Sequence, residues 1–247
     1  MFLKDKIVVL TGCNKGIGKE ILKLFSENKA KVYACVRKID DGFLQDIKAL
    51  EKKNQNKIIP IKFDLNNEIE VKNAANQIIK SEKKIDIIVN NAGSIHTSIF
   101  QMTSSKVIRE IFEVNFFSQS IFTQSLIKLM IKNNKGSIVF ISSSSGIDGN
   151  EGRSAYSSSK AAINTLAKTL SKELGKFNIR VNAIAPGLTD TDMMKKNTPD
   201  NILKDVVSSV SLKRVAKPAE IANVALLLSS DLMSYVTGQV IRVDGGM

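Results

Sequence analysis

Two residues that could act together on a proton stand four positions apart in the second half of the chain. Tyr156 and Lys160 lie in AYSSSKAAINTLAKTL, whose spacing predicts a helix over 154–175. Positions i and i+4 share a helix face, and a nearby cation favours the phenolate of a tyrosine that otherwise titrates at about pH 10. The pair therefore indicates a general acid whose pKa a lysine lowers. The alternative is an aromatic residue and a snorkelling lysine on an amphipathic helix.

A glycine-rich turn, TGCNKGIG, follows the first apolar run of the chain. Gly12 permits a tight turn, and Gly16 and Gly18 let the backbone approach a pyrophosphate and the helix approach a sheet. Free N–H groups at the start of the next helix favour phosphate. The Gly-Lys-Ser/Thr ending of an ATP-binding P-loop is absent, so the turn predicts a dinucleotide site. A turn with only a structural role is the alternative.

The residue after the second predicted strand helps to distinguish an NAD site from an NADP site. Arg37 stands there, and Lys15 adds a cation within the glycine-rich turn. An acidic residue at this place would bind the ribose 2′-hydroxyl of NAD, whereas a cation accepts the 2′-phosphate of NADP. Asp40 and Asp41 lie several residues beyond the strand end. The sequence therefore favours NADP(H), with solvated loop charges as the alternative.

Apolar runs alternate with amphipathic segments along the whole chain. Strands are predicted at 6–11, 31–36, 57–64, 85–90, 136–142, 179–185 and 239–243, and helices at 19–29, 43–53, 67–82, 103–133, 154–175 and 218–229. Strands that are apolar on both faces need helices on both sides. We therefore predict an α/β fold: a single-domain doubly wound parallel sheet (Rossmann) over 1–247, with a substrate lid at 187–210.

The composition disfavours several other classes of protein. Of 247 residues, 36 are Lys or Arg and 24 are Asp or Glu, giving a formal charge of +12, but the lysines are spread along helix faces, so we expect no nucleic-acid partner. No apolar run reaches the roughly 18 residues of a membrane span, and we expect a cytoplasmic protein. Cys13 and Cys35 suit neither a disulfide framework nor a metal site. His96 is the only histidine, which disfavours a Ser-His-Asp hydrolase.

Several short motifs occur in the order and spacing of one enzyme family. They are TGCNKGIG (11–18), NNAG (90–93), Asn115 in EVNFF, ISS (141–143), YSSSK (156–160) and APG (185–187). On these motifs the chain resembles the short-chain dehydrogenase/reductase family over residues 6 to 246. The resemblance implies an oxidoreductase that acts on CH–OH or C=O groups with a nicotinamide dinucleotide. It also implies a catalytic tetrad, which would be Asn115, Ser143, Tyr156 and Lys160.

The same resemblance assigns the cofactor site. Asp64 and Leu65 would flank the adenine, and Thr191 would contact the carboxamide. The implied cofactor-binding residues are Gly12, Asn14, Lys15, Gly16, Ile17, Gly18, Arg37, Asp64, Leu65, Asn91, Ala92, Gly93, Tyr156, Lys160, Pro186, Gly187, Thr189 and Thr191. No metal is expected.

The tetrad suggests how a ketone would be reduced. The cofactor would deliver a hydride to carbon, and Tyr156 a proton to oxygen. Ser143, chosen over Ser142 because it matches the family's serine, would hold the oxygen. Asn115 would disturb its long helix locally and hold a water that links Lys160 to bulk solvent.

Within the family the pattern, including the ending VTGQVIRVDGGM, is most similar to 3-oxoacyl-[acyl-carrier-protein] reductases. This implies NADPH-dependent reduction of a 3-oxoacyl thioester, small or carrier-protein-bound, in fatty acid biosynthesis by a homotetramer. Phe177 stands where such reductases often carry an arginine, with Lys172 and Lys176 as possible substitutes. The alternatives are a sugar, polyol or steroid substrate, or a non-catalytic dinucleotide-binding regulator, which would be expected to have lost Tyr156 or Lys160.

Overall fold

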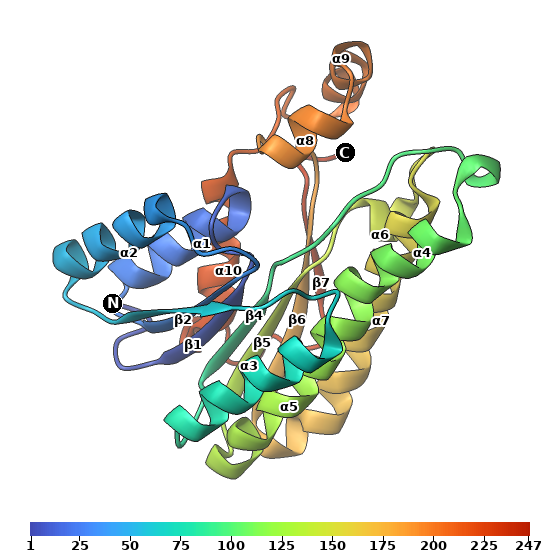
Figure 1. Cartoon of the computed structure of the whole chain (residues 1–247). Coiled ribbons are helices and arrows are strands. Elements are labelled where there is room, and N and C mark those ends of the chain that lie inside the picture. The colour runs from blue at the N-terminus through green and yellow to red at the C-terminus, as the bar shows by residue number, and fades with distance from the viewer.

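A seven-stranded parallel sheet forms the centre of the computed structural model, which describes all 247 residues (Figure 1). Its strands are β1 (Ile7–Thr11), β2 (Lys31–Val36), β3 (Ile58–Lys62), β4 (Ile87–Asn90), β5 (Gly136–Ile141), β6 (Ile179–Pro186) and β7 (Val240–Val243). Their order is β3-β2-β1-β4-β5-β6-β7, and every neighbouring pair is parallel. The chain changes direction across the sheet between β1 and β4, as in a doubly wound fold. The predicted fold class is confirmed.

Helices cover both faces of the sheet (Figure 1). One face carries α1 (Gly16–Glu27), α2 (Asp41–Asn54) and α10 (Pro218–Ser229), and the other carries α3 (Glu68–Ser81), α5 (Ser118–Asn133) and α7 (Ser154–Leu174). Strand side chains alternate between the two faces. In β1, Val8 and Leu10 enter the core under α1, while Val9 enters the core that contains Phe63 and Phe122, whose rings lie 5.0 Å apart. Two apolar layers therefore hold the sheet between them.

The predicted helix over 103–133 is interrupted. The structure has α4 (Ser105–Phe112), then a π-helical turn (Glu113–Phe117), and only then α5. The apolar period continues through the interruption, which is why the sequence reads as one helix. The π turn contains Asn115, so the predicted local disturbance is present at that residue.

Several short helices have no counterpart in the sequence prediction. They are α6 (Ser145–Asp148), α8 (Asp192–Asn197), α9 (Asp200–Ser209) and 3-10 turns at Phe100–Met102, Gly175–Phe177 and Asp231–Met233. These segments are too short or too polar to give a clear apolar period. None of the helices has both the length and the apolar character that crossing a bilayer requires.

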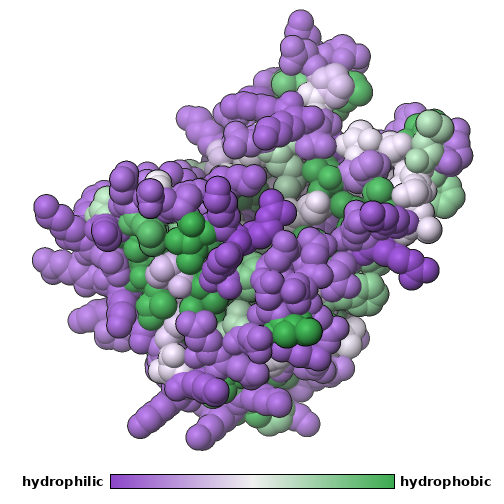
Figure 2. Space-filling view, in the orientation of Figure 1, coloured by the Kyte–Doolittle hydropathy of each residue, from purple (hydrophilic) through white to green (hydrophobic).

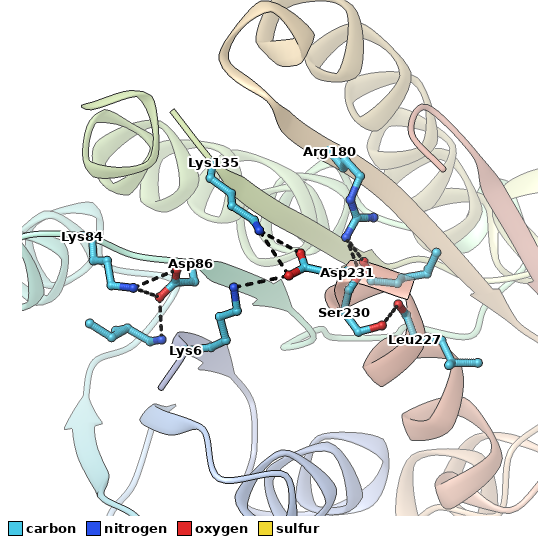
Figure 3. Close-up of polar contacts among 10 residues, drawn as sticks. Lys6, Lys84, Asp86, Lys135, Arg180, Leu227, Ser230 and Asp231 are labelled. Atoms are coloured by element: carbon cyan, nitrogen blue, oxygen red, sulfur yellow. Dashed lines mark hydrogen bonds and ion pairs between the residues drawn. The ribbon is translucent and has the colours of Figure 1, made fainter. Parts of the chain in front are cut away.

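The amino edge of the sheet carries paired charges, which we call the amino-edge cluster: Lys6, Lys84, Asp86, Lys135 and Asp231 (Figure 3). Asp86 pairs with Lys84 at 3.1 Å. Asp231 pairs with Lys135 at 3.1 Å and with Lys6 at 3.8 Å. The carboxylates and ammonium groups of this edge thus have one another as partners, and they join the starts of several strands to the segment after α10.

Candidate active site

The residues singled out by the motifs meet at the opposite, carboxyl edge of the sheet. Gly12 follows β1, Asn91 follows β4, Ser143 follows β5 and Gly187 follows β6. The first turns of α7 approach the same edge, where α8 and α9 stand above it (Figure 1). Ligands of open α/β sheets bind at this edge.

The glycine-rich turn has no room for side chains at two of its positions. Gly12 has a φ of +67°, and a Cβ there would lie 2.7 Å from the Cα of Ala92. A Cβ on Gly18 would lie 2.1 Å from the carbonyl oxygen of Gly12. The side-chain amide of Asn91 donates to the carbonyls of Thr11 and Gly12 at 3.0 and 2.8 Å. The ends of β1 and β4 are therefore locked together, and the glycines are required by this close approach.

The backbone N–H groups of residues 14–18 have no hydrogen-bond partner within the protein. The N–H of Gly12 donates to Cys35 at 2.8 Å, and that of Lys19 donates to Lys15 at 3.2 Å, so the unbonded groups lie between these two bonds. They point from the start of a 12-residue helix, which favours negative charge. The turn, including Asn14, Lys15, Gly16 and Ile17, fits the phosphates of a dinucleotide.

The surroundings of Arg37 separate it from the two nearby carboxylates. Arg37 is exposed directly after β2. The carboxylate of Asp40 accepts the N–H of Phe43 at 2.9 Å and caps α2, and Asp41 lies in the first turn of that helix. Both carboxylates therefore stabilise the start of α2. The side chain at the end of β2, where dinucleotide-binding folds distinguish NAD from NADP, is the guanidinium of Arg37.

The two residues assigned to the adenine follow β3. Asp64 is half-buried and accepts the N–H of Asn66 at 2.9 Å. Leu65 is buried, and its carbonyl accepts the Ser118 hydroxyl at 2.5 Å. The structure places both beside the carboxyl edge, and their contact with adenine stays a prediction.

Asn115 is fully buried and joins two parts of the site. Its side-chain oxygen accepts the N–H of Ser94 at 2.8 Å. Its amide donates to the Ser94 carbonyl at 2.8 Å and to the Ser159 hydroxyl at 3.0 Å. A Cβ on Gly93 would lie 3.3 Å from the Asn115 oxygen and 3.4 Å from the Lys160 nitrogen. Asn115 thus ties the end of β4 to α7 beside Lys160, through two serines that sequence reasoning missed.

The Tyr156 side chain is buried, and Ser143 is the serine beside its hydroxyl. Burial raises the pKa of Tyr156, while the hydrogen bond with Ser143 and the charge of Arg153 act to lower it. The Ser142 hydroxyl instead donates to the backbone carbonyl of Lys160 at 3.2 Å. The Ser142 hydroxyl is therefore engaged with the backbone of α7, and the choice of Ser143 as the residue that shares a substrate oxygen with the phenol stays a prediction.

Lys160 is also buried, and its ammonium lies 5.8 Å from the centre of the Tyr156 ring. It donates to the carbonyl of Ile141 at 2.8 Å. Burial lowers the pKa of Lys160 to about 8. In this structure burial dominates the pKa of Tyr156, and the cation that opposes it is Arg153. That Lys160 stabilises the phenolate during the reaction stays a prediction. The sequence showed the four-residue spacing of Tyr156 and Lys160, but it did not show that both side chains are buried.

The strand β6 ends at Pro186 and leads into a close turn. A Cβ on Gly187 would lie 2.7 Å from the Cβ of Asp244, so the backbone can pass there only as glycine. Thr189 is buried and bridges to Ala216. These residues line the path from β6 toward the predicted lid, on the nicotinamide side that the motifs assign.

The segment 187–210 lies over the glycine-rich turn. Thr191 caps α8 by accepting the N–H of Met194 at 3.2 Å, and its methyl carbon would lie 3.2 Å from a Cβ on Gly16. Figure 2 shows a hollow beneath α8 and α9, with apolar residues exposed along it. The predicted lid therefore contains two helices and reaches the same turn that would hold the phosphates.

The remaining candidates have no role in this site. Cys13 and Cys35 are buried free thiols, and burial raises the pKa of both, which keeps them unreactive. No group of three or more His, Cys, Asp or Glu side chains is arranged to hold a metal ion.

Comparison with known proteins places this arrangement in a family. The family model described as enoyl-(acyl carrier protein) reductase matches residues 12–247. The 3-oxoacyl-[acyl-carrier-protein] reductase FabG of Thermotoga maritima is 36% identical over 250 residues, covering 100% of this chain and 99% of the relative. The 3alpha-hydroxysteroid dehydrogenase of Mediterraneibacter gnavus is 36% identical, covering 99% and 98%. A Beutenbergia cavernae structure, described as a putative NAD(P) dependent gluconate 5-dehydrogenase with NADP bound at low occupancy, superposes with a TM-score of 0.93 at 29% identity, covering 99% of this chain and 97% of that chain.

Proposed function

Because the chain belongs to the short-chain dehydrogenase/reductase family and is an oxidoreductase of carbonyl or alcohol groups, we propose that it reduces the ketone of a 3-oxoacyl thioester with NADPH. The observation that carries this proposal is the largely buried Tyr156 side chain, with Ser143 beside its hydroxyl, at the carboxyl edge of the sheet. The glycine-rich turn and its unbonded N–H groups support a dinucleotide at the same edge.

The proposed reaction uses four side chains of the chain itself. Ser143 donates a hydrogen bond to the substrate carbonyl, and Tyr156 transfers its phenolic proton to that oxygen. Lys160, as an ammonium, stabilises the tyrosinate that remains. Asn115 positions the backbone next to Lys160, and its link to a water stays a prediction. Reduced nicotinamide, when bound, would supply the hydride to the carbonyl carbon.

Two features support NADPH over NADH. Arg37 is an exposed guanidinium without an acidic partner at the end of β2, and Lys15 is an exposed ammonium in the glycine-rich turn. Either could contact a 2′-phosphate. The Beutenbergia cavernae structure is described with NADP bound at low occupancy.

The acyl carrier protein is proposed as the carrier of the thioester because the relative from Thermotoga maritima is named for it. The formal charge of +12 would suit an acidic partner. Lys172 lies about 24 Å beyond Tyr156 along α7, at about 1.5 Å per residue, and Lys176 follows the end of that helix. These lysines could therefore contact only the body of a carrier or act in another subunit, not the reacting acyl group.

A second candidate substrate is a steroid ketone. It is suggested by the Mediterraneibacter gnavus relative, which is named a 3alpha-hydroxysteroid dehydrogenase and is as similar to this chain, at 36% identity, as the Thermotoga maritima reductase. The homotetramer, the cytoplasmic location and the lid role of residues 187–210 stay predictions of this proposal. Each would leave the chemistry at Tyr156 unchanged.

The test is steady-state oxidation of NADPH with a panel of substrates. The panel holds an acetoacetyl thioester, a crotonyl thioester, a 3-oxosteroid and a ketose. We expect kcat/KM to be at least about tenfold higher for the acetoacetyl thioester than for any other member. A preference for the crotonyl thioester would indicate an enoyl reductase, and a preference for the steroid would indicate the second candidate. No oxidation with any substrate would support a non-catalytic dinucleotide-binding protein.

A further inference from the structure

Arg153 is a half-buried cation next to the proposed proton donor. It directly precedes α7 and stands three residues before Tyr156, so the two lie on the same side of the first helical turn. Burial lowers the pKa of Arg153, and Tyr156 is the only ionisable group that opposes this change. No carboxylate pairs with it. Its charge is therefore held in the site without neutralisation.

The guanidinium uses only one of its three nitrogens. Nη2 donates to the carbonyl of Asn197 at 3.1 Å and to the hydroxyl of Thr198 at 3.3 Å. Asn197 ends α8 and Thr198 joins it to α9, so this nitrogen contacts the predicted lid. Nε and Nη1 have no hydrogen-bond partner in the protein. Three N–H donors of this guanidinium consequently have no partner in the protein.

Arg180 shows how the chain satisfies a comparably buried arginine that has a structural role. Its Nη2 donates to the carbonyls of Leu228 and Ser230 at 2.7 and 3.0 Å, and its Nη1 donates to Val236 at 3.3 Å. Burial lowers its pKa, and the carboxylate of Asp231 raises it (Figure 3). Arg153 has neither the second bonded nitrogen nor an acid. Desolvating a cation without a partner is unfavourable unless a ligand completes the site.

We propose that Arg153 binds a second oxygen of the substrate and so selects ketones that carry an oxygen acceptor next to the reacting carbonyl. A 3-oxoacyl thioester carries a thioester carbonyl two carbons from the ketone, and a 3-oxo acid carries a carboxylate there. Both place an acceptor where a planar guanidinium can bind it. This inference rests on the proposed function for the class of substrate. It adds a specificity residue outside the four-residue tetrad.

The experiment compares Arg153→Gln with wild type on three ketones. They are an acetoacetyl thioester, acetoacetate, and 2,2,2-trifluoroacetophenone, which has no second oxygen. Arg153 should bind either the acetoacetyl thioester or acetoacetate, and we expect kcat/KM for that substrate to fall by about 10- to 100-fold. For the aryl ketone kcat/KM should fall by less than about threefold. A larger loss with acetoacetate identifies a carboxylate, and a larger loss with the thioester identifies the thioester carbonyl. Arg153→Lys should recover part of the loss for a carboxylate because it keeps the charge.

Two controls separate this role from others. Lys168→Gln removes an exposed cation from the same helix, α7, and leaves Arg153 and its lid contacts intact, so it should change kcat/KM for all three substrates by less than about threefold. NADPH binding, followed by fluorescence, should be unchanged in Arg153→Gln, which also reports on folding. Equal losses on all three ketones, or no loss on any, would overturn the proposal.

Failure of the proposed function would look different. In that case wild type reduces the aryl ketone but neither oxo compound. Inhibition of aryl-ketone reduction by acetoacetate and by a 3-hydroxybutyryl thioester then tests Arg153 directly. We expect the inhibition constant of at least one of them to rise by about tenfold or more in Arg153→Gln. An unchanged constant for both would contradict the role of Arg153.

Discussion

The two edges of the sheet differ in how their cations are partnered. At the amino edge, the lysines of the amino-edge cluster pair with Asp86 and Asp231 (Figure 3). At the carboxyl edge, four cations have no acidic partner in the protein: Lys15, Arg37, Arg153 and Lys160. Both edges are built from the ends of the same strands. Ion pairs also occur near the carboxyl edge, where Arg242 pairs with Asp148 and Asp244. What distinguishes the carboxyl edge is that the cations of the glycine-rich turn, the end of β2 and the Tyr156 region are unpaired, which leaves them available to ligands.

The ionisation of groups at the two edges follows the same division. Burial alone would raise the pKa of Asp231, but its hydrogen bond with Lys135 and the nearby cations lower it overall. Burial raises the pKa of Tyr156 and lowers that of Lys160 to about 8. A group that titrates near neutrality occurs where proton transfer is proposed, as is typical of active sites.

Tyr156→Phe should have the largest effect on activity. It removes the phenolic proton and leaves the ring, so turnover should fall by about 10²–10⁴-fold while NADPH binding is retained. Steady-state oxidation of NADPH measures turnover, and fluorescence titration measures NADPH binding. Tyr235→Phe is the matched control, because Tyr235 is 100% exposed, and it should behave as wild type. Retained turnover in Tyr156→Phe would mean that another group donates the proton.

Arg37→Asp tests the unpaired cation at the end of β2. We expect KM for NADPH to rise by roughly 10- to 100-fold, because a bond to a 2′-phosphate is lost and a repulsion is gained, while KM for NADH changes little or falls. Lys48→Asp makes a similar charge change on the exposed face of α2 and should leave both values within about twofold. An equal rise in KM for NADPH and for NADH would show that Arg37 does not bind the 2′-phosphate.

The pKa of Lys160 predicts a pH dependence. Below pH 8 the ammonium is charged and stabilises the tyrosinate. As pH rises through about 8 it loses its proton, so ketone reduction should decline, approaching about tenfold per pH unit. The measurement is kcat against pH between 6 and 10 at saturating NADPH. A step near pH 8 that persists in Lys160→Met would assign the ionisation to another group.

Asp231→Asn should have the smallest effect. It removes the carboxylate that pairs with Lys6 and Lys135 at the amino edge. The Asp231 side chain is 65% exposed, so these ion pairs are screened by solvent. The free energy of unfolding should fall by no more than ~1 kcal/mol, and kcat/KM should stay within about twofold. Urea unfolding and steady-state kinetics check the two quantities. A tenfold loss of activity would remove the distinction between the edges.

The sequence predicted the sheet, its parallel strands and the helices on both faces because apolar runs and helical periods survive without tertiary context. It also predicted which residues meet at the carboxyl edge, since motif order fixes the strand ends on which they stand. The π turn at Asn115 could be expected only from the family resemblance, because the apolar period runs through it.

Other features of the site depend on tertiary contacts that have no local signal. Ser94 and Ser159 became visible only as partners of Asn115. Arg153 looks like an ordinary charged residue before a helix until its burial and its contact with the end of α8 are known. The pKa of Tyr156 could not be predicted from the spacing to Lys160, because burial outweighs the nearby charges.

Hydrogen–deuterium exchange with and without NADPH tests the division between the two edges most directly. We expect slower exchange in peptides that contain residues 12–18 and 90–94 when NADPH is present, since their backbone N–H groups would bind or border the cofactor. Peptides covering residues 84–87 and 227–234 at the amino edge should exchange at the same rate in both conditions. Protection confined to the amino edge, or no protection at residues 12–18, would contradict a dinucleotide site at the carboxyl edge.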